Sequence, residues 1–210
     1  MSKLSVTELS EKYSDLLKEL GNIGAGNATS ALSQMMGMKL DMDRSDVRLL
    51  SFKDVGGAMG GADQVMVGIY LLAEGDINGS MMFLLGTKSA RNLVNVLMGT
   101  PDNTSEELSE IELSALKEVG NIITGAYLNS LSMLTGLSML PSVPSIAVDM
   151  MGAILSVPAI AFGIEADEIL LVDTQFSSDV QMDGYFIMLP DMDSYAKILK
   201  ALGMGDYTIG

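Results

Sequence analysis

The chain contains two copies of one short segment, ninety-nine residues apart. The residues KELGNI at 18–23 recur as KEVGNI at 117–122. Identities at the same spacing extend the match: Leu17/Leu116, Gly26/Gly125, Leu32/Leu131, Ser33/Ser132 and Gly37/Gly136. Both copies place Gly-Asn inside a helical pattern, where Gly alone costs roughly 1 kcal/mol relative to Ala. A local cost that occurs twice suggests a site that occurs twice, and a repeat this long indicates gene duplication with fusion.

The two halves show the same order of predicted elements. In the first half, Ser5 and Glu8 form a capping box for a helix that runs to about residue 36. We then expect strands near 39–52, 64–73 and 77–85, and a helix near 88–97. In the second half we expect a helix over 109–135, strands near 139–148, 168–176 and 182–189, and a helix over 194–202. The apolar segment 150–162 has no counterpart in the first half.

These patterns predict an α/β fold of the α+β type. Two pseudo-symmetric helix–three-strand–helix halves are expected to be fused about a shared sheet, with a long motif-bearing helix in each half. The chain would then be a single domain over 1–210, made of two internal repeats at about 1–98 and 104–210.

The composition removes several classes of chemistry. The chain has no His and no Cys, so it lacks the usual general base, a thiolate nucleophile and the commonest metal ligands. A net charge of −15 argues against nucleic-acid binding, which needs clustered Lys and Arg. No signal peptide is visible, and prolines interrupt the apolar stretch 128–164. We therefore expect a cytoplasmic protein without membrane insertion.

The repeated helix carries the most informative polar residues. Positions i, i+4 and i+7 of a helix share one face. This spacing aligns two triplets: Asp15, Glu19 and Asn22, and Ser114, Glu118 and Asn121. An Asn amide cannot remove a proton, but it can orient a water for attack, as Gln does in some phosphoryl-transfer enzymes. A Glu can bind a cation, so the pair fits half of a site that another protein completes. The alternative is that the residues only face solvent and are shared by descent.

Other motifs have less support. The glycines at 21–26 could be taken for a nucleotide loop, but they lie inside a helical pattern, and Thr29 takes the third Gly position of G-x-G-x-x-G. The acidic residues Asp41, Asp43 and Asp46 lack the Gly and terminal Glu of an EF-hand. A Ser hydrolase would lack its base.

The second copy resembles the signature of a known family. It reads Ser114-x-x-x-Glu118-x-x-Asn121 and, after twenty-two intervening residues, Pro144. This is similar to the motif of the CheC/CheX/FliY family of chemotaxis phosphatases. The first copy departs from it, because Ser45 stands at the Pro position.

The resemblance implies a specific activity. Members of this family remove phosphate from the aspartyl phosphate of the response regulator CheY, which brings the phosphoryl group, its Mg²⁺ and a Lys. No metal or cofactor of the chain's own is implied. By resemblance, Asn121 and Asn22 orient the attacking water, and Glu118 and Glu19 pair with the regulator's Lys. Three residues would support the geometry of these sites: Ser114, Asp15 and Pro144.

Two motif copies in one chain of this length resemble the CheC type, for which we expect a monomer. The resemblance also implies a second partner, the receptor deamidase CheD, at the segment 147–153 with Asp149, Met150 and Gly152. A buried core helix is the open alternative for this segment. The alternative function is a non-catalytic module that binds CheY or CheD, like the middle domain of the flagellar switch protein FliM.

Overall fold

The computed structural model describes residues 2–4, 6–50, 57, 61–105, 107–161, 169–177, 184–204 and 207–209. Its helices are α1 (Val6–Met36), α3 (Thr87–Met98), α4 (Glu110–Thr135), α5 (Met151–Ala161) and α6 (Met192–Ala201). Its strands are β1 (Ser2–Leu4), β2 (Asp41–Leu50), β3 (Val65–Gly75), β4 (Gly79–Gly86), β5 (Met139–Pro141), β6 (Ser145–Met150), β7 (Ile169–Ser177), β8 (Gly184–Pro190) and β9 (Tyr207–Ile209). The predicted capping residue Ser5 lies outside the described residues.

One antiparallel sheet joins the two halves. Its seven strands follow the order β2-β7-β8-β4-β3-β5, and β6 also pairs with β3. Strands are exchanged between the halves: β2 of the first half pairs with β7 of the second, and β6 of the second half pairs with β3 of the first. Strands β2, β3 and β4 of the first half correspond to β6, β7 and β8 of the second, and exchanging them reverses the strand order. The pseudo-twofold axis therefore lies between β4 and β8, which pair with each other. The predicted fold class, with pseudo-symmetric halves about a shared sheet, is confirmed.

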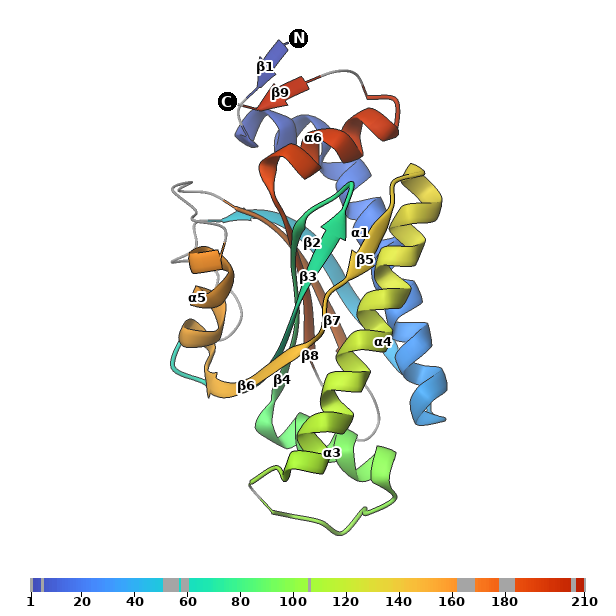
Figure 1. The fold of residues 1–210 in the computed structure, drawn as a ribbon, viewed down its shortest axis with the longest axis vertical. Coiled ribbons are helices and arrows are strands. Elements are labelled where there is room, and N and C mark those ends of the chain that lie inside the picture. The colour runs from blue at the N-terminus through green and yellow to red at the C-terminus, as the bar shows by residue number, and fades with distance from the viewer. Residues whose placement is uncertain are drawn as a thin grey trace.

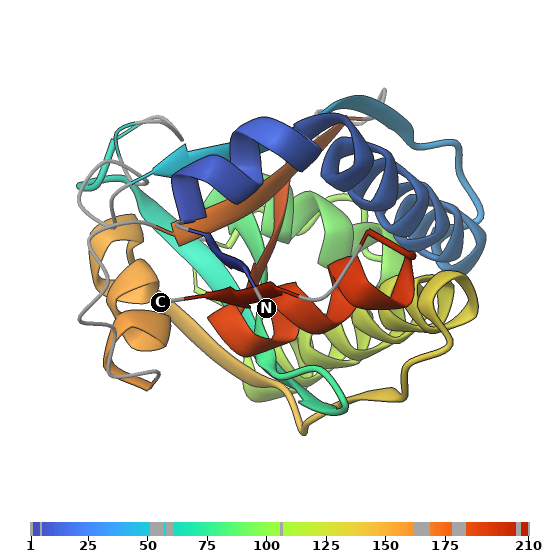
Figure 2. The ribbon, with the colours of Figure 1, turned by 90° about the horizontal axis from the view of Figure 1, so that it is seen from above.

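Helices cover both faces of this sheet. The long helices α1 and α4 lie side by side on one face, and α5 covers the other (Figures 1 and 2). The shorter helices α3 and α6 lie at opposite ends of the molecule (Figure 1). This arrangement places the two motif-bearing helices next to each other on one side.

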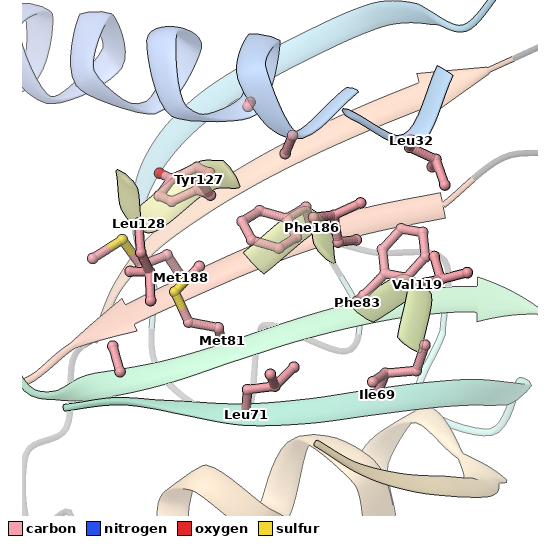
Figure 3. Close-up of a cluster of buried hydrophobic side chains, with 14 of the residues drawn as sticks. Leu32, Ile69, Leu71, Met81, Phe83, Val119, Tyr127, Leu128, Phe186 and Met188 are labelled. Atoms are coloured by element: carbon pink, nitrogen blue, oxygen red, sulfur yellow. The ribbon is translucent and has the colours of Figure 1, made fainter. Parts of the chain in front are cut away.

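The sheet is buried on both faces at its centre. The five residues from Met81 to Leu85 of β4 are each no more than 1% exposed. Met81, Phe83 and Leu85 pack under α1 and α4, whereas Met82 and Leu84 pack against Ile154 and Leu155 of α5. Since successive strand residues point to opposite faces, a sheet covered on both sides requires the continuous apolar run that the sequence shows. Figure 3 shows the core on the α1 and α4 side.

The two long helices pack through small residues of α1 and large residues of α4. A Cβ added at Gly24 of α1 would lie 2.6 Å from the Tyr127 ring of α4. The residues at the matching positions are Ile123 and Ala28, both buried and lining one small cavity. The large residue therefore lies on α4 in both pairs, and the small residue on α1. The Tyr127 ring also contacts Phe186 of β8, with 4.8 Å between ring centroids (Figure 3).

Two details differ from the prediction. The strand expected over 139–148 is split into β5 and β6 by residues 142–144. The short strands β1 and β9, which form a separate parallel pair, were not predicted. Within the described residues, no helix is long and apolar enough to cross a membrane.

Candidate functional site

The second motif depends on how α4 begins. Ser109 caps the helix, and the backbone N–H of Ser109 donates to the Glu112 carboxylate over 2.7 Å. The Glu112 carboxylate also forms a buried ion pair with Arg91 of α3. The Ser109 N–H, followed by Arg91, holds the pKa of Glu112 down at about 2. The first turn of α4 is thus fixed to α3, and with it the direction of the motif helix.

The connection between the halves is part of the same network. Arg91 donates to the carbonyl oxygen of Glu107 over 2.6 Å, and the side chain of Asn103 donates to Glu112 over 3.2 Å. The Asn95 side chain in turn donates to the Asn103 carbonyl oxygen over 2.8 Å. This cluster was not predicted from the sequence. Its only local signal was the spacing Ser109-x-x-Glu112, which is a capping box.

Both triplets lie on accessible helix faces. Asp15 and Glu19 of α1 are exposed and Asn22 is half-buried. The corresponding residues of α4 behave identically: Ser114 and Glu118 are exposed, and Asn121 is half-buried. At every position from 15 to 22 whose side chain is described, the burial class equals that found ninety-nine residues later. The two helices therefore present the same polar arrangement twice, on one side of the molecule.

The Gly before Asn121 lets α4 lie close to the sheet. A Cβ added at Gly120 would lie 2.5 Å from Cγ2 of Ile69 in β3. Real Cβ atoms do not approach that closely, so any larger residue would push the helix and strand apart. Close packing against Ile69 thus explains why Gly120, which has a low helix propensity, lies inside α4 directly before Asn121.

Pro144 lies near this contact at a break in the edge of the sheet. Ile69, on which Gly120 rests, pairs with Ile146 of β6, and Pro144 comes two residues earlier. The break is anchored at Ser142, whose N–H donates to the Leu72 carbonyl oxygen and whose hydroxyl accepts from the Leu72 N–H, both over 2.8 Å. The segment from β5 to β6 runs alongside α4 (Figure 1). Pro144 therefore belongs to the surroundings of the second triplet.

The first half differs at this point. Ser45 lies within β2, a single strand from Asp41 to Leu50. The pairing of β2 with β7 shifts register between Met42 and Arg44 and joins Ser45 to Thr174. Proline cannot donate to a sheet ladder and is typical of edge strands and interruptions. The replacement of Pro by Ser thus accompanies a continuous strand where the second half has a gap.

The segment predicted to contact a second partner is partly exposed and partly buried. Asp149 and Met150 at the end of β6 are exposed, Met150 by 48%. Gly152 is half-buried, and its N–H donates to the Ala62 carbonyl oxygen over 2.9 Å. The following α5 buries Met151 and Ile154 against the sheet. The buried-helix alternative therefore holds from Met151 onward and not for Asp149 and Met150.

Within the described part of the chain, no three acidic residues gather in a way that could hold a metal ion. The residues at hand for chemistry in each triplet are one carboxylate and one amide, with Asp15 as a second carboxylate in the first. They can orient a water or bind a cationic group, and with no His or Cys in the chain the carboxylates are the bases at hand.

Comparisons with known proteins agree with the motif. The CheC-like family matches residues 14–43 and 111–148, which contain both triplets. The chain is 39% identical over 200 residues to CheY-P phosphatase CheC of Bacillus subtilis, covering 93% of this chain and 96% of that protein. It is 24% identical over 187 residues to the putative CheY-P phosphatase CheC1 of Halobacterium salinarum, covering 89% and 94%.

Solved structures share the fold. FliY of Thermotoga maritima matches with a TM-score of 0.72 at 22% identity, covering 92% of this chain and 96% of that one. The FliM middle domain of H. pylori matches with a TM-score of 0.65 at 14% identity, covering 91% and 99%. CheX of Desulfovibrio desulfuricans matches with a TM-score of 0.56 at 16% identity, covering 82% and 99%.

Proposed function

Because the chain belongs to the CheC-like family, we propose that it removes the phosphoryl group from a phosphorylated CheY-type response regulator. The observation that carries the proposal is the pair of an exposed Glu and a half-buried Asn that recurs on two adjacent helices. It is supported by the sequence identity of 39% to a CheY-P phosphatase over 93% of this chain. Glu118 and Asn121 would form one site, and Glu19 and Asn22 the other.

In this proposal each site is completed by the regulator. The regulator supplies the aspartyl phosphate, its bound Mg²⁺, which offsets charge on the phosphoryl oxygens, and a Lys that pairs with Glu118 or Glu19. The amide of Asn121 or Asn22 holds a water in line with the phosphorus. The water oxygen bonds to phosphorus as the bond to the aspartyl oxygen breaks, which releases inorganic phosphate and a free Asp carboxylate. The water proton leaves with the phosphate, because an Asn amide cannot accept it.

The surrounding residues would hold this geometry. Ser114 and Asp15 lie one helical turn before each Glu on the same exposed face. Pro144 would fix the chain at the break beside the second site, and Gly120 lets Asn121 lie near the sheet. A displacement of about 1 Å at such a site can cost a hundredfold in rate, so these supports matter for catalysis without touching the phosphoryl group.

The test measures phosphate release from CheY phosphorylated by a small-molecule phosphodonor, with Mg²⁺ present. Wild type should accelerate release, Asn22→Ala and Asn121→Ala should each remove one site, and the double variant should lose about a hundredfold or more. Matched controls are Asn27→Ala and Asn129→Ala, which remove exposed amides from the same helices and should change nothing. Full activity in the double variant would exclude these amides as the catalytic groups.

A second candidate function is binding without hydrolysis. The fold is shared with FliM middle domains, so the fold itself is compatible with a module that only holds CheY or CheD. The recurrence of Glu and Asn in both helices favours the phosphatase. Binding of phosphorylated CheY without any acceleration of phosphate release would favour the module.

We also propose that the corner between β6 and α5 binds CheD, through exposed Asp149 and Met150 with Gly152 behind them. Asp149→Asn should weaken CheD binding in a titration while leaving phosphate release unchanged. Asp102→Asn is the matched control, because Asp102 is also exposed but lies in the connection between α3 and α4, away from this corner. Unchanged CheD affinity in Asp149→Asn would refute this assignment. We expect the chain to be cytoplasmic. We also expect it to be a monomer, which a molar mass from light scattering would test.

A further inference from the structure

Three exposed apolar side chains border the second Glu–Asn pair. Ile111 is 69% exposed and lies seven residues before Glu118, hence on the same face of α4. Ile122 is 36% exposed and follows Asn121 directly. Val143 is 89% exposed and directly precedes Pro144 at the break between β5 and β6. We call these three residues the apolar border.

The first half lacks this border. The residues ninety-nine positions earlier are Lys12, Ile23 and Arg44. Two of the three apolar residues are thus replaced by cations, and Ile23 is less exposed than Ile122. The triplets match in burial, so the difference between the halves lies in the residue types at these three positions.

Folding does not require the apolar border. None of its members fills the core, and substituting each by a polar residue would leave the described packing intact. Single exposed apolar residues are ordinary on protein surfaces, whereas apolar residues gathered at one place mark contact with a partner. Here Ile111 lies about 10 Å from Glu118 along the same helix face, Ile122 adjoins Asn121, and Val143 adjoins the motif residue Pro144.

We propose that the apolar border docks the phosphorylated response regulator at the second site and makes that site the tighter of the two. This inference rests on the proposed function. Its occupant is a phosphorylated receiver domain that presents a Lys to Glu118 and apolar side chains around it to Ile111, Ile122 and Val143. The first site, with Lys12 and Arg44 in the corresponding places, binds the same regulator more weakly.

The test installs the first half's residues at the second site. In an Asn22→Ala background, which leaves only the second site, Ile111→Lys with Val143→Arg should raise KM for phosphorylated CheY about ten- to hundredfold and leave kcat unchanged. The neutral pair Ile111→Gln with Val143→Gln should also raise KM, which separates lost apolar contact from added charge. Thermal unfolding of each variant verifies that folding is unaffected.

The matched control is Met133→Gln. Met133 is 80% exposed on α4, and Gln34 occupies the corresponding place in α1. It lies fifteen residues beyond Glu118, about 22 Å along the helix, against about 10 Å for Ile111, so its substitution should leave KM unchanged. An equal rise of KM in Met133→Gln would show a general effect of surface hydrophobicity and overturn the proposal.

The reverse exchange tests the same inference. In an Asn121→Ala background, Lys12→Ile with Arg44→Val should lower KM at the first site. Unchanged KM in the exchanges at both sites, with phosphate release intact, would refute the border while leaving the phosphatase standing. If wild type releases no phosphate, the proposed function fails, and affinity for beryllofluoride-treated CheY, whose bound beryllofluoride stands in for the phosphoryl group, still tests the border.

Discussion

The contact between Gly120 and Ile69 makes a quantitative prediction about the motif glycine. In Gly120→Ala, the new Cβ would lie 2.5 Å from Cγ2 of Ile69, so the helix and strand must separate. Overpacking of this kind typically costs about 1–3 kcal/mol. The higher helix propensity of Ala returns about 1 kcal/mol. The free energy of unfolding should therefore fall by about 0–2 kcal/mol.

The same helix offers a matched control. Gly125 has no atom within 4 Å of an added Cβ, so Gly125→Ala should gain up to about 1 kcal/mol from helix propensity alone. The two variants should thus differ by about 1–3 kcal/mol in urea unfolding, and each kcal/mol shifts Tm by about 2–4 °C for a chain of this size. Equal stability of the two variants would refute the packing argument.

The contact also predicts a loss of activity and a route to its recovery. Because Asn121 follows Gly120, separating α4 from β3 should displace the amide, and phosphate release at the second site should fall about tenfold or more in Gly120→Ala. Adding Ile69→Ala removes the clashing atom. The double variant should recover activity even though Ile69→Ala alone is destabilising by about 2–5 kcal/mol. No recovery would mean that the contact does not position Asn121.

Two further predictions concern the network at the start of α4 and the unbroken strand β2. The lowered pKa of Glu112, about 2, means that its contribution to stability is complete above its unfolded pKa near 4.5 and is lost as the pH falls toward 2. Wild type should therefore lose stability between pH 5 and 2 more steeply than Glu112→Gln, and parallel acid unfolding curves would contradict this assignment. Ser45→Pro in an Asn121→Ala background should leave phosphate release at the first site low, because β2 is continuous there and one residue does not create the gap at 142–144. A rise to the rate of the second site would show that Ser45 alone limits the first.

The local features of this fold could be predicted from the sequence, because they follow from periodicity. The spacing of Glu118 and Asn121 on a helix was enough to place both on one face, and the repeat placed Glu19 and Asn22 in the same way. The continuous apolar run at 81–85 indicated a strand, and burial of both faces explains its composition.

Features that depend on distant partners could not be predicted in this way. Nothing local in β2 indicates that it pairs with β7 from the other half, in a register that joins Ser45 to Thr174. The partner of Glu112 is Arg91, which lies in another helix, and no periodicity links them. The strands β1 and β9 have three residues each, too few for an alternating pattern to be recognised.

The split between β5 and β6 is marked in the sequence by two prolines. Pro141 and Pro144 lie within 139–148, but the apolar residues around them favoured one continuous strand. The structure shows that the prolines mark an interruption at the edge of the sheet. The apolar border was equally visible in the sequence, yet only the exposures of Ile111 and Val143 distinguish it from core residues.

The most direct measurement is the crystal structure of this chain bound to beryllofluoride-treated CheY, with beryllofluoride standing in for the phosphoryl group. The proposed mechanism predicts the Asn121 amide within hydrogen-bond reach, about 3 Å, of a water in line with the beryllium. It also predicts the regulator's Lys on Glu118, with Ile111 and Val143 covered. A regulator seated away from α1 and α4, or an amide too far from the beryllofluoride to share a water with it, would contradict the mechanism.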